Sequence, residues 1–187
     1  MKYLIAGLGN IGEEYANTRH NIGFIILDAM AKEFDASFSI DRHAYYSKIR
    51  YKGRTFILIK PTSYMNLSGK AVKFWLTKEK IIPENLLVVV DDIALPTATL
   101  RMKYKGGDGG HNGLIDIIKS IGTDKFPRLR IGIGDDFSRG HQSDYVLGKW
   151  SRSEEKILIP KIDTAVQMIK SFGTIGIGRT MTAYNNK

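Results

Sequence analysis

The sequence predicts a single α/β domain whose twisted, mixed β-sheet is flanked by helices. Short apolar runs alternate with helical patterns along the chain, as is typical of layered α/β folds. The runs 48–51 and 55–60 are separated only by "KGR", which predicts a hairpin and therefore a mixed rather than a purely parallel sheet. The 187 residues are 43% hydrophobic and show no repeat or linker, so we expect one domain, 1–187.

Each predicted strand is a short apolar run rich in β-branched and aromatic residues. In chain order these runs are 3–8, 48–51, 55–60, 86–90, 99–104 and 129–133. Helices are predicted where apolar residues recur at three- and four-residue spacing. These stretches are 22–34, 66–78, 112–121 and 153–172.

The last predicted helix carries two further signals. Ser151 and Glu154 have the spacing of a capping box, in which each side chain bonds to the backbone of the other residue. Pro160 has no N–H to give to a helix interior. We therefore expect Pro160 to lie in the first turns or to kink the helix.

The charge of the chain favours a polyanionic partner. Twenty-eight Lys and Arg stand against 19 Asp and Glu, which leaves a net charge of +9. Nucleic acid ranks ahead of a membrane surface, because no basic amphipathic anchor helix is evident. Many basic proteins of this size nevertheless bind no polyanion specifically, so charge alone leaves the matter open.

Other classes are excluded by what the sequence lacks. Without cysteine, the chain has no disulfide, no thiolate metal site and no cysteine nucleophile. No apolar run approaches the length that spans a bilayer, and no signal peptide is recognisable at Met1. We therefore expect a cytoplasmic protein with no membrane association.

The opening "YLIAGLGNIGEEYANTRHNIGF" contains the glycine pattern of a dinucleotide-binding turn, Gly7-x-Gly9-x-x-Gly12. Such a turn needs a helix that starts at the third glycine, so that its N-terminus meets the pyrophosphate. Here the residues "EEYANTRH" follow Gly12, without helical periodicity and with two carboxylates. NAD or FAD binding is therefore disfavoured, and bound-cofactor absorbance remains a simple test of a dinucleotide-dependent oxidoreductase.

Polar residues follow the predicted strands at several points. Open α/β sheets place their sites beyond the carboxyl ends of strands, so we expect these residues to meet. Taken singly, each has an ordinary structural explanation as a turn residue, a helix N-cap or a solvated surface group. The residues in question are Asn10, His20, Asn66, Asp91, Asp92, His111 and Asn112.

This set of residues suits attack by water rather than by a protein nucleophile. The sequence has no Gly-x-Ser-x-Gly elbow, no His-Glu-x-x-His and no Walker lysine motif, and its four histidines are too dispersed to suggest a metal site. A histidine oriented by an aspartate can act as general base toward water. Amide side chains can bind a carbonyl and the developing oxyanion. Hydrolysis of an activated acyl group, preferably an ester, is the predicted chemistry.

Five segments, in order, resemble the bacterial-type peptidyl-tRNA hydrolase family: "GLGNIGEEYANTRHNIGF", "KPTSYMNLSG", "DDIALP", "KGGDGGHNGL" and "RLRIGIG". The resemblance covers most of the chain and thins after about Trp150. It implies cleavage of the ester between a peptide and the 3′ end of tRNA, which recycles tRNA from aborted translation. It also implies a cofactor-free cytoplasmic monomer with no obligate protein partner and no metal, with a mixed sheet ringed by helices.

The resemblance also implies roles for matching residues. His20 corresponds to the general base, Asp91 to its orienting partner and Asn10 to a further catalytic group. The remaining positions correspond to a substrate cleft, Tyr15, Met65, Asn66, His111 and Asn112, and to a clamp for the tRNA 5′-phosphate, Lys103 and Arg130.

Two positions depart from the family pattern: Ile11 stands where proline is usual, and Asp92 where glutamate is common. The first departure affects the turn that presents Asn10, and the second is chemically mild. A non-catalytic RNA-binding protein of the same fold is the alternative. The presence of His20, Asp91, Asn10 and Asn112 favours the enzyme.

Overall fold

The computed structural model describes residues 1–185, and it contains one sheet of seven strands. The spatial order is β2-β3-β4-β1-β5-β7-β6. The strands are β1 (Lys2–Gly7), β2 (Ser39–Asp41), β3 (Ala44–Tyr51), β4 (Arg54–Pro61), β5 (Leu86–Asp92), β6 (Leu100–Lys103) and β7 (Arg128–Gly132). The sheet is mixed, as predicted: β4, β1, β5 and β7 run parallel, whereas β2–β3, β3–β4 and β6–β7 pair antiparallel.

Helices and 3-10 turns connect and cover these strands. The helices are α1 (Ile22–Glu33), α2 (Ser68–Glu79), α3 (Asn112–Ile121), α4 (Gln142–Val146), α5 (Arg152–Ile175) and α6 (Ile177–Tyr184). The 3-10 turns are η1 (Glu13–Tyr15), η2 (Arg19–Asn21), η3 (Met65–Leu67) and η4 (Pro83–Asn85). Among the described helices, none is both long and apolar enough to cross a membrane.

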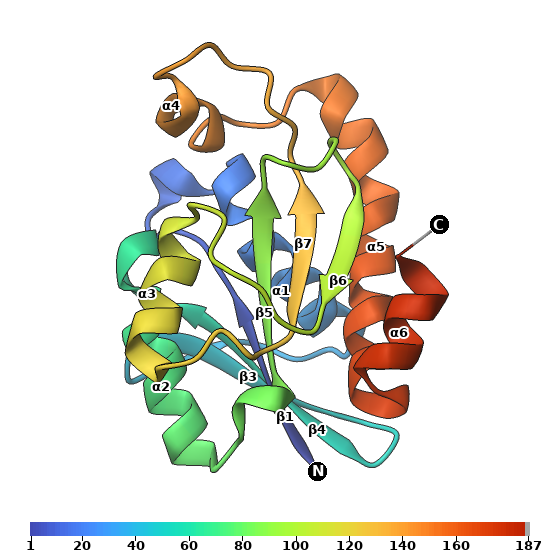
Figure 1. Cartoon of the computed structure of the whole chain (residues 1–187). Helices are drawn as coiled ribbons and strands as arrows, with labels where there is room; N and C mark the ends of the chain where they lie inside the picture. The colour runs from blue at the N-terminus through green and yellow to red at the C-terminus, as the bar shows by residue number, and fades with distance from the viewer. Residues whose placement is uncertain (186–187) are drawn as a thin grey trace.

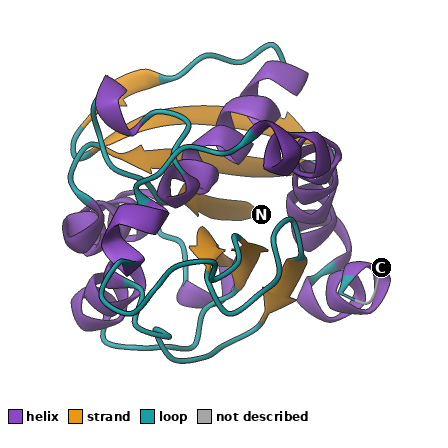
Figure 2. Ribbon diagram, turned by 90° about the horizontal axis from the view of Figure 1, so that it is seen from above, coloured by secondary structure: helices purple, strands orange, loops and turns teal. Residues whose placement is uncertain are grey.

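The sheet is sandwiched between two helical layers (Figures 1 and 2). Helices α2 and α3, at the left in Figure 1, pack on one face of the sheet, and α1, behind the strands, and α5, at the right, pack on the other face. Alternate residues of β1 divide between the two cores, with Tyr3 and Ile5 in one and Leu4 and Ala6 in the other. Burial on both sides explains why "LLVVV" in β5 is continuously apolar rather than alternating.

The predicted hairpin is confirmed, since β3 and β4 pair up to Tyr51 and Arg54 around a turn in which Lys52 and Gly53 have positive φ. The predicted strand 48–51 was too short, however, because β3 begins at Ala44. Strand β2 was missed altogether. It is three residues long and none of its side chains is buried, so it lacks the apolar alternation that reveals a strand.

The predicted helices differ from the observed ones mainly at their ends. The stretch 66–78 begins as the 3-10 turn η3 and becomes α-helical only at Ser68. The capping box between Ser151 and Glu154 is confirmed at the start of α5. Pro160 lies inside α5, beyond its first two turns, and the helix continues to Ile175. Pro160 is exposed, so water can reach the carbonyl whose helical partner it removes.

The glycines near the N-terminus allow α1 to pack directly on the ends of β1 and β5. A Cβ atom at Gly23 would lie 2.6 Å from the carbonyl oxygens of Leu8 and Val89, and one at Gly7 would collide with the carbonyl of Gly23. Only the one-turn 3-10 helix η1 follows Gly12, and α1 does not start until Ile22, so no α-helix begins at the third glycine. Close packing therefore accounts for Gly7 without a bound dinucleotide.

This packing predicts opposite effects for two glycines in matched positions. Gly23 and Gly178 are each the second residue of a helix and each follows an isoleucine, but a Cβ at Gly178 meets nothing within 4 Å. We expect Gly178→Ala to raise the free energy of unfolding by about 0.5–1 kcal/mol. Gly23→Ala should lower it by about 1–3 kcal/mol, because backbone atoms must shift.

Urea unfolding of both variants measures the difference, and Gly178→Ala serves as the control for helix propensity. Equal changes in the two variants would contradict the proposed close contact between α1 and the two strands.

Candidate active site

A cleft of about 830 Å³ lies over the face of the sheet that carries α3, near the carboxyl ends of β1 and β5. It brings together nine of the ten residues predicted for the site. These are Asn10, His20, Met65, Asn66, Asp91, Lys103, His111, Asn112 and Arg130. The tenth, Tyr15, does not line the cleft, but its ring packs edge-to-face on Tyr64, which does, with centroids 6.2 Å apart.

At the centre of the cleft, His20 and Asp91 form a buried pair. His20 lies in η2, and Asp91 ends the buried run of β5. Nδ1 of His20 is 2.8 Å and 2.9 Å from the two carboxylate oxygens of Asp91. Burial opposes ionisation of Asp91, but attraction to His20 and His111 and hydrogen bonds from both outweigh it, so the pKa of Asp91 stays below its ordinary value. Asp91 is therefore a carboxylate that accepts hydrogen bonds.

His111 also contacts Asp91, and its other ring nitrogen fixes its protonation. Nδ1 of His111 accepts the backbone N–H groups of Gly113 and Leu114 and so caps α3. A nitrogen that accepts these bonds carries no proton, so the proton must be on Nε2, 2.9 Å from Oδ1 of Asp91. The N-cap of α3 is therefore His111, and not Asn112 as one interpretation of the sequence suggested.

The tautomer of His20 follows from the same carboxylate. Because ionised Asp91 can only accept, Nδ1 of His20 must donate. Nε2 of His20 has no hydrogen-bond partner among the described residues. In the neutral imidazole it is therefore Nε2 that has the lone pair that a general base requires.

Asn21, which sequence reasoning missed, holds the turn that presents Asn10. Its Oδ1 accepts the backbone N–H of Asn10 at 2.8 Å, and its Nδ2 donates to the backbone carbonyl of Asn10 at 2.9 Å. Both residues are buried. The turn is thus closed by a side chain, although Ile11 occupies the position where proline was expected.

The amide groups of the three predicted asparagines are left available to a ligand. Oδ1 of Asn10 accepts the backbone N–H of Met65 at 2.7 Å, which orients its Nδ2 as a remaining donor. The side chains of Asn66 and Asn112 are exposed and make no hydrogen bond within residues 1–185. The cleft therefore offers amide donors and acceptors around His20.

Arg19 joins the turn of His20 to the C-terminal part of the chain, a link that the sequence did not reveal. Its guanidinium forms a two-pronged ion pair with Glu154, with Nη2–Oε2 at 2.9 Å, and donates to the carbonyl of Tyr145. It also stacks over the ring of Tyr145 at 4.3 Å. Glu154 caps α5 as well, so one carboxylate fixes both α5 and the turn that carries His20.

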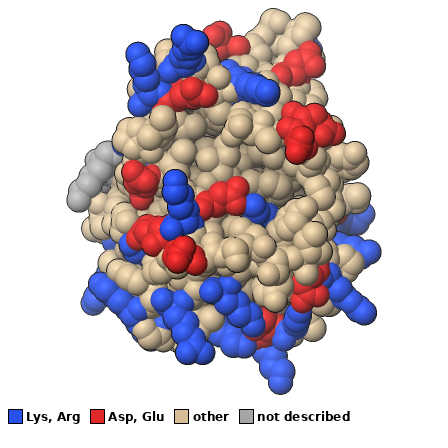
Figure 3. Space-filling model, turned by 180° about the vertical axis from the view of Figure 1, so that it is seen from behind, with Lys and Arg blue, Asp and Glu red and all other residues tan. Residues whose placement is uncertain are grey.

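One end of the cleft is basic. Lys103 and Arg130 both line it, and Arg130 is paired with Asp92. Arg128, the cross-strand partner of Lys103, also lines the cleft and is only 2% exposed; it donates to the carbonyls of Gly106 and Gly107. Basic side chains are not confined to the cleft. Seen from behind the view of Figure 1, the molecule carries many Lys and Arg side chains along its lower edge (Figure 3).

The donor atoms of His20, Asp91 and His111 lie within 4.8 Å of one another, a spacing that a metal ion can also occupy. Hydrogen bonds from both histidines to the carboxylate account for this closeness. The two N–H groups that contact Asp91 thus have an acceptor in its carboxylate.

Replacing Asn21 should reveal how much the Asn10 turn depends on it. Asn21→Ala leaves a buried N–H and a buried carbonyl of Asn10 without partners, so we expect the free energy of unfolding to fall by about 1–3 kcal/mol. Asn66→Ala is the matched control, because Asn66 is exposed and makes no hydrogen bond among the described residues. Equal stability of the two variants in urea unfolding would show that Asn21 does not hold the turn.

Comparison with known proteins agrees with this architecture. The model of the family described as peptidyl-tRNA hydrolase matches residues 4–187. Curated peptidyl-tRNA hydrolases from Phocaeicola vulgatus and Cytophaga hutchinsonii are 54% and 52% identical over 187 residues, the full length of each protein and of this chain. The crystal structure of peptidyl-tRNA hydrolase from Acinetobacter baumannii superposes with a TM-score of 0.92 at 36% identity, covering 97% of this chain and 95% of that one. The chain belongs to the peptidyl-tRNA hydrolase family.

Proposed function

We propose that the chain hydrolyses the ester between an N-blocked aminoacyl or peptidyl group and tRNA, with His20 as general base. The observation that carries the proposal is the hydrogen bond from Nδ1 of His20 to buried Asp91, which leaves Nε2 free in the cleft. Family membership supports the substrate, because the curated relatives are named for peptidyl-tRNA.

In the proposed reaction, Nε2 of His20 takes a proton from water while the water oxygen bonds to the ester carbonyl carbon. The carbonyl π electrons move to oxygen, and the amide donors of Asn10 and Asn112 stabilise the resulting oxyanion. When the intermediate collapses, the bond to the 3′ oxygen of tRNA breaks and that oxygen receives the proton from His20. Asp91 stabilises the imidazolium formed between these steps.

The rest of the cleft is proposed to bind the substrate on either side of this centre. Met65, Asn66, His111 and Asn112 would hold the peptide and the 3′-terminal region, with Tyr15 supporting the rim through Tyr64. Lys103 and Arg130 would bind the 5′-phosphate of tRNA. All of these groups come from one chain, which is consistent with a monomer that acts on tRNA in the cytoplasm without a protein partner.

A non-catalytic tRNA-binding protein is the competing function. It would use the same basic cleft but would have no need for a histidine in a fixed tautomer. Hydrolysis of N-acetylaminoacyl-tRNA, with free aminoacyl-tRNA as the control substrate, separates the two. Binding without release of the N-acetylamino acid would favour the competing function.

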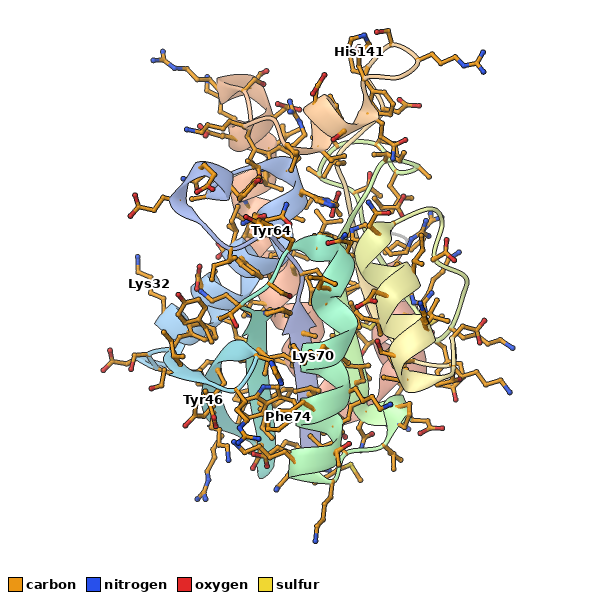
Figure 4. The ribbon with its side chains drawn as sticks, turned by 90° about the vertical axis from the view of Figure 1, so that its left-hand side faces the viewer. Lys32, Tyr46, Tyr64, Lys70, Phe74 and His141 are labelled. Carbon is orange, nitrogen blue, oxygen red and sulfur yellow. The ribbon has the colours of Figure 1, made fainter. Side chains whose placement is uncertain are left out.

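His20→Ala should fold normally and lose most of its activity. General-base assistance is worth about 10²–10⁴-fold, so kcat on N-acetylaminoacyl-tRNA should fall by that factor. His141→Ala is the matched control, because His141 is exposed and lies at the top of the molecule, outside the residues that line the cleft (Figure 4). Near-normal turnover by His20→Ala would contradict the proposed mechanism.

Replacing Lys103 and Arg130 together by Ala should raise KM much more than it lowers kcat, because phosphate contacts position the substrate at a distance from the ester. The salt dependence of binding should also become less steep. The control is the double variant of Lys32 and Lys70, which has the same change in charge at exposed residues outside the cleft (Figure 4).

Removal of the 5′-phosphate from tRNA sharpens this test. The wild-type protein should lose affinity for the dephosphorylated substrate, whereas the Lys103 and Arg130 double variant should show almost no further loss. If the two losses simply add, these residues do not contact the phosphate.

A further inference from the structure

A second cavity of about 370 Å³ lies on the other side of the Asn10 turn from the cleft. Its volume falls within the range of small ligand sites. Its lining comes from the segment after β1, from α1 and from the hairpin β3–β4. The lining residues that matter for its chemistry are Ile11, Glu13, Phe24, Ile25, Asp28, Tyr45 and Lys60.

We propose that this cavity binds apolar side chains of the peptide part of the substrate, several residues from the ester. This inference rests on the proposed function and extends it, because it assigns a peptide subsite outside the cleft. It implies a preference for longer, apolar peptides over a single N-blocked amino acid.

The second cavity and the cleft share one lining residue, Asn10. Asn21, which bonds to the backbone of Asn10, lines the second cavity. A contact between two rings also links the walls of the two cavities. Tyr64 lines the cleft, and its ring packs against that of Tyr15. Tyr15 belongs to η1, whose first residue, Glu13, lines the second cavity. In Figure 4, Tyr64 lies at the upper end of α2, beside the segment that contains η1. A chain that leaves the cleft past Asn10 reaches this cavity.

The order of the strands gives the direction of the substrate. Across the sheet, β4, β1, β5 and β7 are consecutive neighbours. Lys60, near the end of β4, and Asn10, just after β1, lie on one side of Asp91 on β5, and Arg130 on β7 lies on the other. If tRNA is held at Arg130 and the ester at His20, the peptide extends toward Asn10 and Lys60.

The ammonium group of Lys60 is suited to bind a peptide carbonyl at this cavity. Its side chain is 14% exposed, and the rings of Phe38, Phe24 and Tyr45 lie 4.2 Å, 5.7 Å and 5.8 Å from Nζ. Asp28 is its only hydrogen-bond partner among residues 1–185. An ammonium has three N–H donors, so donors remain for a carbonyl of the substrate.

The charges of the lining favour a peptide over nucleic acid. The cavity carries two carboxylates, Glu13 and Asp28, against the one ammonium of Lys60. Carboxylates beside a phosphodiester chain are repulsive, whereas the neutral backbone of a peptide meets no such penalty. Ile11, Phe24 and Ile25 supply apolar surface for side chains.

Two variants change the cavity without touching the residues assigned to catalysis. Ala16→Trp fills it from an exposed lining position, and Lys60→Met removes the ammonium while keeping a long side chain. Gln167→Trp adds the same indole at an exposed position of α5 that lines neither cavity, and is the control. Each variant is assayed with N-acetylalanyl-tRNA and with an N-acetylated tetrapeptidyl-tRNA that carries Phe at its two residues farthest from the ester.

We expect Ala16→Trp to lower kcat/KM on the Phe-containing tetrapeptidyl-tRNA by about tenfold, roughly the contribution of partly burying one large apolar side chain. Lys60→Met should lower it on the same substrate to a smaller extent. Neither variant should change kcat/KM on N-acetylalanyl-tRNA. An all-Gly tetrapeptidyl-tRNA should be insensitive to Ala16→Trp, because it has no side chain to bury. Lys60→Met should still weaken it, because the carbonyl proposed to bind Lys60 belongs to the peptide backbone.

Equal losses on the short and long substrates, or no loss with either variant, would overturn the proposal. The proposed function is tested separately, because it requires only that the wild-type protein hydrolyse N-acetylalanyl-tRNA.

Discussion

The site depends on one buried carboxylate, that of Asp91, which accepts hydrogen bonds from two imidazoles. Burial of an ionised group is costly unless it is paired, and here His20 and His111 supply the pairing. Because the carboxylate can only accept, each histidine must present an N–H to it. The consequence for His20 is a free Nε2 in the cleft, and the consequence for His111 is a Nδ1 free to cap α3. The orientation of His20 and the start of α3 are therefore set by the same group.

The packing around Asp91 explains how a loop-rich site is kept in place. Gly23 lets α1 approach the ends of β1 and β5, which brings the turn before α1 close to Asp91. Asn21 at that turn binds the backbone of Asn10, and Arg19 binds Glu154 at the start of α5. The three consecutive residues of η2 thus have three functions: docking to α5, contact with Asp91 and support of Asn10.

Much of the fold could be predicted from patterns that are local in the sequence. Most residues that line the candidate site could be predicted from those patterns together with the family resemblance. The buried run before Asp91 and the Gly-rich segment before His111 both indicate elements that end at one edge of a sheet. Strand β2 could not be predicted because it buries no side chain. The roles of Arg19 and Asn21 depend on partners that only folding brings near, so no local pattern marks them. The cap of α3 is a histidine, which is not among the residue types that usually mark a helix start, so its role could not be predicted from sequence.

The tautomers of His20 and His111 are the most direct test of this description, and long-range ¹H–¹⁵N NMR of histidine-labelled protein at neutral pH measures them. Signals are assigned by substituting the four histidines one at a time. We predict that His20 carries its proton on Nδ1 and leaves Nε2 unprotonated, and that His111 carries its proton on Nε2 and leaves Nδ1 unprotonated. A proton on Nε2 of His20 together with an unprotonated Nδ1, or a protonated Nδ1 in His111, would contradict the arrangement around Asp91.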